Sequence, residues 1–135
     1  MVDLIWNFLR EIQEDKEYIL VATSGLQAPP LNMAMSDEII ELTNQVVGQL
    51  RDADGCMGYA LHNSFMPYSE WTVSIWESDD AVNQFFRTGT HLAVIKKLGE
   101  LIQANFKHAR WLMDGSELPP AWEQILEELD QKDAY

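Results

Sequence analysis

The sequence predicts an α+β domain built as a ferredoxin-like βαββαβ plait, with one additional helix at each end. Two patterns support this fold class: alternating apolar residues predict strands, and apolar stripes at helical spacing predict the helices between them. The order of these segments, strand, helix, strand, strand, helix, strand, is the third observation. A length of 135 residues suits one domain, so we expect residues 1–135 to fold as a single unit.

The first half of the chain contains two predicted helices and one predicted strand. Residues 2–14 carry apolar side chains at helical spacing and predict a short amphipathic helix outside the central motif. Residues 17–24 alternate and predict the first strand. Ser36, followed by two acidic residues, has the chemistry of a helix start, and the helix it opens should end near Asp52. Gly55 is suited to the turn that follows.

The second half begins with a hairpin and closes with a helix. Residues 56–66 and 70–76 alternate with a period of two, and the turn between them predicts an antiparallel pair. Ser78 with two aspartates opens a helix that should break near Arg87. A helical segment, a strand and an acidic helix complete the prediction, at residues 91–98, 106–113 and 121–130.

The stretch from residue 70 to residue 98 resembles a known family. A strand from Trp71 to Trp76, the sequence Glu77-Ser78-Asp79-Asp80-Ala81, the pair Phe85-Phe86 and His91 follow one another in this stretch. This arrangement resembles the antibiotic-biosynthesis-monooxygenase-like group of dimeric α+β barrels, and the resemblance runs from Tyr18 to Pro120. It implies the fold more strongly than an activity, because one fold supports many functions.

The predicted plait also implies a dimer. Helices cover one face of such a sheet, and the other face stays open. We expect Trp76 and other large side chains on the open face, and an apolar face of this size must be covered. Pairing of two copies, sheet face to sheet face, is the physical solution and is also what the resemblance implies. The sequence therefore predicts a homodimer.

The candidate site lies on that predicted open face. Strand parity groups an imidazole, hydroxyls and an indole there, and the last strand adds a second imidazole and a guanidinium: His62, Thr72, Ser74, Trp76, His108 and Arg110. Such a set suits an anionic or carbonyl-bearing aromatic ligand. We assign catalytic roles to His62 and Arg110 and substrate binding to the other four. The alternative is that His62 and Arg110 are satisfied polar residues inside a dimer.

Two classes of function fit these residues. The first is a monooxygenase-like enzyme, such as a cofactor-independent oxygenase, acting on a small aromatic or carbonyl compound. His62 would transfer a proton and Arg110 would stabilise negative charge. The second is a non-catalytic small-molecule-binding or stress-related dimer that uses the same pocket without turnover. A pocket filled by Trp76 and Tyr59 would favour the second.

Haem and metal ions are not expected as cofactors. The resemblance implies a haem-ligating histidine ten residues after an aromatic residue, but Lys96 follows Phe86 at that spacing and Ile95 follows Phe85. His91 follows Gly-Thr at a helix start, where a capping or packing role is expected. Neither Cys-x-x-Cys nor His-x-x-x-His is present, so the sequence predicts no metal site.

The composition excludes several partners. Nine basic and 22 acidic residues give a formal net charge of −13, which repels nucleic acid and anionic membranes. No apolar run approaches the roughly 20 residues of a membrane span, and the N-terminus lacks the features of a secretory signal. We therefore expect a cytoplasmic protein. Cys56, the single cysteine, is expected to be a small core residue.

Overall fold

The computed structural model describes residues 4–26, 33–65, 68–87, 92–93, 96–97 and 107–131. The strands are β1 (Asn7–Phe8), β2 (Glu17–Leu26), β3 (Cys56–Phe65), β4 (Tyr68–Trp76) and β5 (Lys107–Asp114). The helices are α1 (Met33–Asp52), α2 (Asp79–Arg87), the 3-10 turn η1 (Gly115–Glu117) and α4 (Trp122–Asp130). None of the helices in these ranges is both long and apolar enough to cross a membrane.

The strands form one antiparallel sheet in the order β1-β3-β4-β2-β5. Without β1, this is the strand order of a ferredoxin-like plait: the first and third strands of the motif are central, and the second and fourth flank them. The predicted α+β class and the βαββαβ order are confirmed. Of the predicted helical segment at residues 91–98, residues 92–93 and 96–97 are helical. His91 and Ile95 lie outside the described residues.

The predicted N-terminal helix is wrong. Asn7 and Phe8 instead form the short edge strand β1, which pairs with Gly58 and Tyr59 of β3. Gly58 permits this pairing, because a Cβ atom there would lie 3.0 Å from the carbonyl oxygen of Asn7 and 3.3 Å from the Cα atom of Phe8. The apolar side chains that suggested a helix still have a packing role, since Trp6 and Ile12 pack against the sheet. Tertiary packing therefore overrides the helical periodicity of this segment.

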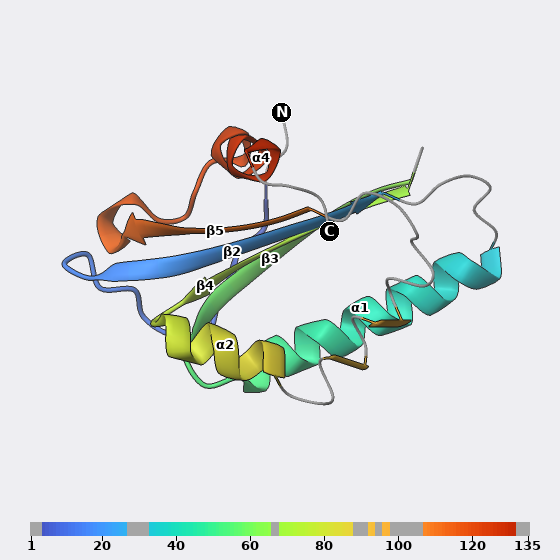
Figure 1. Ribbon diagram of the computed structural model, residues 1–135, viewed down its shortest axis with the longest axis horizontal. Coiled ribbons are helices and arrows are strands. Elements are labelled where there is room, and N and C mark those ends of the chain that lie inside the picture. The colour runs from blue at the N-terminus through green and yellow to red at the C-terminus, as the bar shows by residue number, and fades with distance from the viewer. Residues whose placement is uncertain are drawn as a thin grey trace.

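Helices α1 and α2 cover one face of the sheet (Figure 1). Buried side chains from both helices and from the sheet meet there in one core cluster: Ile19, Val21, Leu42, Val46, Leu50, Cys56, Tyr59, Trp76, Val82 and Phe85. We call this the helix-covered face. Trp76 is 0% exposed in this cluster, so the prediction that it lies on an open face is wrong.

Helix α4 lies on the opposite side of the sheet (Figure 1). Its residues Ile125 and Leu129 pack against Ala22, Val73 and Ala109. Beside them, residues of the N-terminal segment cover Tyr18, Leu20 and Ile75. We call this the α4-covered face. Its central side chains are buried within a single chain, so the predicted open face is absent from the described structure.

Candidate active site

The strand register shows which predicted residues share a face. Arg110 lies in a row with Val21, Ser74 and Tyr59 across four strands. The next row on the same side contains His108, Thr23, Thr72 and Leu61. Because residues two apart in a strand point to the same side, Trp76 also belongs to this side. Five of the six predicted site residues therefore lie on the helix-covered face.

His62 is the exception. It pairs with Trp71 across the hairpin and lies on the α4-covered face. Its ring centroid is 5.3 Å from the centroids of both Trp71 and Trp122, and these two indoles also meet edge to face. The predicted convergence of His62 with Arg110 is wrong, because the sheet separates them.

The hairpin turn explains this error. We placed Tyr68 and Ser69 in the turn, whereas both belong to β4, and Tyr68 pairs with Phe65. The pairing offset of a hairpin depends on turn length, and a shift of one residue moves a side chain to the other face. The alternation of side chains within each strand therefore predicted correctly which residues share a side. The pairing offset between β3 and β4 was predicted wrongly.

Ser74 and Trp76 form a buried pair on the helix-covered face. The Trp76 indole Nε1 donates a hydrogen bond of 2.7 Å to Ser74 Oγ. The indole also lies 5.0 Å from the ring of Phe85, measured between centroids. Both side chains are buried, so they contribute to the packing beneath the candidate site and not to its exposed surface.

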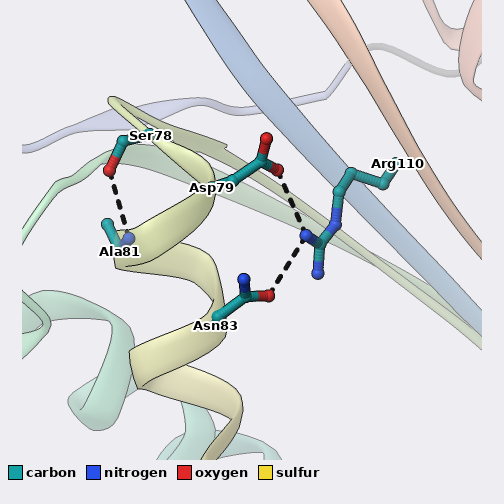
Figure 2. Close-up of polar contacts among 5 residues, drawn as sticks. All are labelled: Ser78, Asp79, Ala81, Asn83 and Arg110. Atoms are coloured by element: carbon teal, nitrogen blue, oxygen red, sulfur yellow. Dashed lines mark hydrogen bonds and ion pairs between the residues drawn. The ribbon is translucent and has the colours of Figure 1, made fainter.

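Arg110 is held at the N-terminal end of α2 (Figure 2). Its Nη1 atom donates to Asp79 Oδ1 at 3.2 Å and to Asn83 Oδ1 at 3.3 Å. The Arg110 side chain is 32% exposed and that of Asp79 is 62% exposed, so the ion pair contributes little to stability, at most about 1 kcal/mol. Its main effect is to orient the guanidinium. Nε and Nη2 make no hydrogen bond to any residue that the structure describes, and they remain available for an anionic group.

His108 lies two residues before Arg110 on the same side of β5 and is half-buried. Its ring meets Phe86 of α2 edge to face, with centroids 6.2 Å apart. Residues two apart in a strand are separated by about 7 Å, so one small ligand can contact both side chains. The imidazole and the guanidinium thus lie on the same side of β5, beside α2.

Three residues of this region were missed from the sequence: Glu70, Asp79 and Asn83. Glu70 Oε2 accepts a hydrogen bond of 3.1 Å from the Thr43 hydroxyl of α1. Its position two residues before Thr72 places it on the helix-covered face, so strand parity alone was sufficient to find it. No comparable sequence pattern indicates Asp79 and Asn83, because their role depends on how α2 packs beside β5.

Cys56 is a core residue, as predicted. It is 1% exposed, and its thiol donates a weak hydrogen bond to the Gly58 carbonyl oxygen at 3.7 Å. Burial raises the pKa of the Cys56 thiol from its ordinary value of 9.0 to about 11, although the Gly58 contact and the charge of Arg10 oppose this rise. The thiol is therefore protonated at neutral pH. Within the described ranges, no three His, Cys, Asp or Glu side chains gather closely enough to hold a metal ion.

The chain was compared with protein-family models and with curated proteins. The model of the family "Antibiotic biosynthesis monooxygenase" matches residues 34–97, which run from α1 through β3, β4 and α2. The sequence has no match among curated proteins.

Three solved structures show the same fold at low sequence identity. A crystal structure of an antibiotic biosynthesis monooxygenase has a TM-score of 0.57 at 18% identity, covering 71% of this chain and 96% of the other. The cofactor-independent oxygenase SnoaB from Streptomyces nogalater has a TM-score of 0.54 at 14% identity, covering 78% and 99%. The hydroxynitrile lyase from Passiflora edulis has a TM-score of 0.58 at 12% identity, also covering 78% and 99%. These likenesses show the fold alone.

Proposed function

We propose that the chain is a cofactor-independent oxygenase, because residues 34–97 match the model of the antibiotic biosynthesis monooxygenase family. Its substrate would be a small aromatic or carbonyl compound that becomes reactive toward O₂ when it loses a proton. The observation that carries this proposal is the pairing of an oriented guanidinium, Arg110, with an imidazole, His108, on one face of the sheet. The solved structure of a cofactor-independent oxygenase with this fold supports the same reading.

Each residue has a defined role in this proposal. The His108 imidazole accepts the proton of a phenol, enol or acidic C–H group. Arg110 stabilises the anion that forms, through Nε and Nη2, which make no hydrogen bond to a described residue, while Asp79 and Asn83 hold the guanidinium in place. His108 replaces His62 as the proposed base because His62 lies on the other face. Thr72, half-buried in the row of His108, would bind the substrate.

The test is oxygen uptake with a panel of hydroxylated aromatic compounds, without added metal or cofactor. Arg110→Ala should lower kcat/KM by about 10²-fold or more, as expected when a charge-stabilising donor is removed. His108→Ala should lower it by about 10²-fold to 10⁴-fold, as expected when a general base is removed. Lys107→Ala is the matched control, because Lys107 is on the same strand but contacts Asp130 on the other face.

Two outcomes would oppose an active site here. Equal rates for wild type, Arg110→Ala and His108→Ala would show that neither side chain takes part in the reaction. Oxygen uptake that disappears in the Lys107→Ala control would show that the losses reflect general damage to β5.

A second candidate function is a non-catalytic small-molecule-binding or stress-related protein. The burial of Trp76 and Tyr59, 0% and 2% exposed, favours it, because these large side chains fill part of the helix-covered face. Thermal stabilisation by an aromatic acid without oxygen uptake would support this function. If Arg110→Ala abolished the stabilisation, the ligand would lie beside Arg110.

The family resemblance noted in the sequence implies a dimeric barrel. For this chain the homodimer stays a prediction, and the surface we expected it to use is covered by α4 and the N-terminal segment.

A further inference from the structure

A cavity separate from the candidate active site lies on the α4-covered face, where the last turn of α4 meets the end of the sheet. Its volume is about 310 Å³, and its lining includes an indole, two leucines, a serine and one pair of opposite charges: Trp71, Leu126, Leu129, Ser24, Lys107 and Asp130. We propose that this cavity binds a free aromatic α-amino acid. The ligand carboxylate pairs with Lys107, its ammonium group pairs with Asp130, and its ring lies against Trp71.

Three adjacent strands form the floor of this cavity. Trp71 of β4 pairs with Ser24 of β2, and Ser24 pairs with Lys107 of β5, so the three residues form one row across the sheet. Neighbouring strands lie about 4.8 Å apart, which places the Cα atoms of Trp71 and Lys107 about 10 Å from one another. A single aromatic amino acid bridges this row when its charged end lies at Lys107 and its ring lies at Trp71.

The Trp71 indole provides the aromatic wall of the cavity. It is half-buried, and the rings of His62 and Trp122 each lie 5.3 Å from it, measured between centroids. These contacts fix the orientation of the indole in the absence of a ligand, which lowers the entropic cost of binding. A ligand ring can pack against the indole in an offset or edge-to-face arrangement. Leu126 and Leu129 of α4 supply further apolar surface.

The charged end of the cavity carries one cation and one anion. Lys107 Nζ donates to Asp130 Oδ1 at 3.3 Å, and the two side chains are 38% and 74% exposed. So exposed a pair contributes little to stability, and a ligand can separate its two members at low cost. A zwitterion then satisfies both side chains. Because α4 ends at Asp130, the negative end of the helix dipole also favours the ligand ammonium group at this position.

Net charge and volume restrict the class of ligand. The formal net charge of −13 repels a free monoanion, whereas a zwitterion carries no net charge and is not repelled. A cation without a carboxylate would separate Lys107 from Asp130 and give Lys107 no new partner. The volume of about 310 Å³ is at the lower end of the range for small-molecule pockets, which suits one amino acid better than a peptide.

This site does not depend on the proposed oxygenase activity. Lys107 and His108 are neighbours in β5, but their side chains point to opposite faces of the sheet. The sheet therefore separates the amino-acid site from Arg110 and His108, and binding can be measured without any turnover.

The test is isothermal titration calorimetry of the full chain with L-phenylalanine and three analogues that each lack one part of it. Phenethylamine lacks the carboxylate, 3-phenylpropionate lacks the ammonium group, and glycine lacks the ring. L-Phenylalanine should bind with one molecule per chain. Each analogue should bind at least about tenfold more weakly, as expected when a charge-assisted hydrogen bond or a ring contact is lost.

Two charge-reversal variants locate the site. Lys107→Glu should lower the affinity for L-phenylalanine by about tenfold or more, because it places a carboxylate where the ligand carboxylate binds. Combining it with Asp130→Lys should restore the affinity, with the charged end of the ligand reversed. Lys97→Glu is the matched control, since Lys97 forms an exposed ion pair of the same kind with Glu38, at 3.6 Å, and does not line the cavity. Its affinity should equal that of the wild type.

Three results would each overturn the proposal. The first is the absence of binding at about 10 mM L-phenylalanine. The second is equal affinity for 3-phenylpropionate, which would indicate a site for anions. The third is a folded Lys107→Glu variant that binds as tightly as the wild type, which would place the ligand elsewhere. The analogue series uses the wild-type protein, so it decides the proposal even where a variant fails to fold.

Discussion

At the scale of single residues, Cys56 shows how burial determines reactivity. Its thiol lies in the core, and its pKa is raised to about 11. The unfolded chain would ionise this thiol from about pH 9, whereas the folded chain would not. The unfolded state then binds fewer protons, so the free energy of unfolding should fall as the pH rises from about 9 to about 11.

Urea unfolding across this pH range measures the effect. Below about pH 9 the thiol is protonated in both states and contributes no pH dependence. Cys56→Ala should be less stable than wild type at pH 8 because it leaves a small cavity, but its stability should fall less steeply at high pH. Parallel curves for the two proteins would mean that the buried thiol does not resist ionisation.

The residues of the candidate site could be predicted only in part. Alternation along β4 correctly placed Thr72, Ser74 and Trp76 on one side of a strand. It could not tell which side the helices cover, because a strand with both faces buried has apolar residues on each. His62 lies opposite α1 and α2, as expected, but Thr72, Ser74 and Trp76 were placed on its side of the sheet and lie on the other, because the relation between the two strands depends on the length of the hairpin turn. Arg110 and His108 were found, but the packing of α2 that orients Arg110 has no signal in the sequence.

At the scale of elements, Ser78 fixes the start of α2. Its hydroxyl oxygen accepts a hydrogen bond of 3.1 Å from the Ala81 backbone N–H, which would otherwise lack an intrahelical partner (Figure 2). Ser78→Ala should lower the free energy of unfolding by about 1 kcal/mol. Because α2 also carries Asp79 and Asn83, the same change should weaken the orientation of Arg110.

Chemical denaturation compares this variant with Ser116→Ala, in which an exposed serine outside α2 is removed. The control should change stability by less than about 0.5 kcal/mol. Equal losses in both variants would show that Ser78 does not act as a cap. Ser78→Asp should recover most of the loss, since a carboxylate also caps a helix and interacts favourably with its positive end.

Most elements were predicted near their observed ends, and the failure at residues 2–14 is informative. Helical spacing of apolar residues was present, but Gly58 offered a sheet edge close to the backbone of Phe8. Pairing with this edge depends on a residue about fifty positions away, which a local pattern does not contain. For α2, by contrast, the cap and the two aspartates lie within the helix start itself.

At the scale of the whole molecule, we expect the net charge to determine how the Tm changes with salt concentration. A formal charge of −13 produces repulsion throughout the folded chain. The described ion pairs of Arg110 with Asp79 and of Lys107 with Asp130 are exposed, and salt would weaken each by at most about 1 kcal/mol. We expect repulsion to outweigh these pairs, so the Tm should rise as NaCl increases from about 20 to about 200 mM.

Thermal unfolding in NaCl and in choline chloride tests this expectation, because both salts screen charge to the same extent. The Tm should rise similarly in the two salts. Replacement of two exposed acids of α4, Glu123→Gln with Glu127→Gln, should reduce the rise. A fall in the Tm with added salt would mean that favourable ion pairs outweigh repulsion.

The placement of α4 after β5 in the chain has a consequence for synthesis. The strands that form the α4-covered face run from residue 17 to residue 114, so all of them leave the ribosome before Trp122 to Asp130. Domains begin to fold during translation, and transiently exposed apolar surface invites association. During that interval the sheet displays the face that α4 later covers. We therefore expect nascent chains stalled before Trp122 to recruit chaperones more strongly than chains that have released α4.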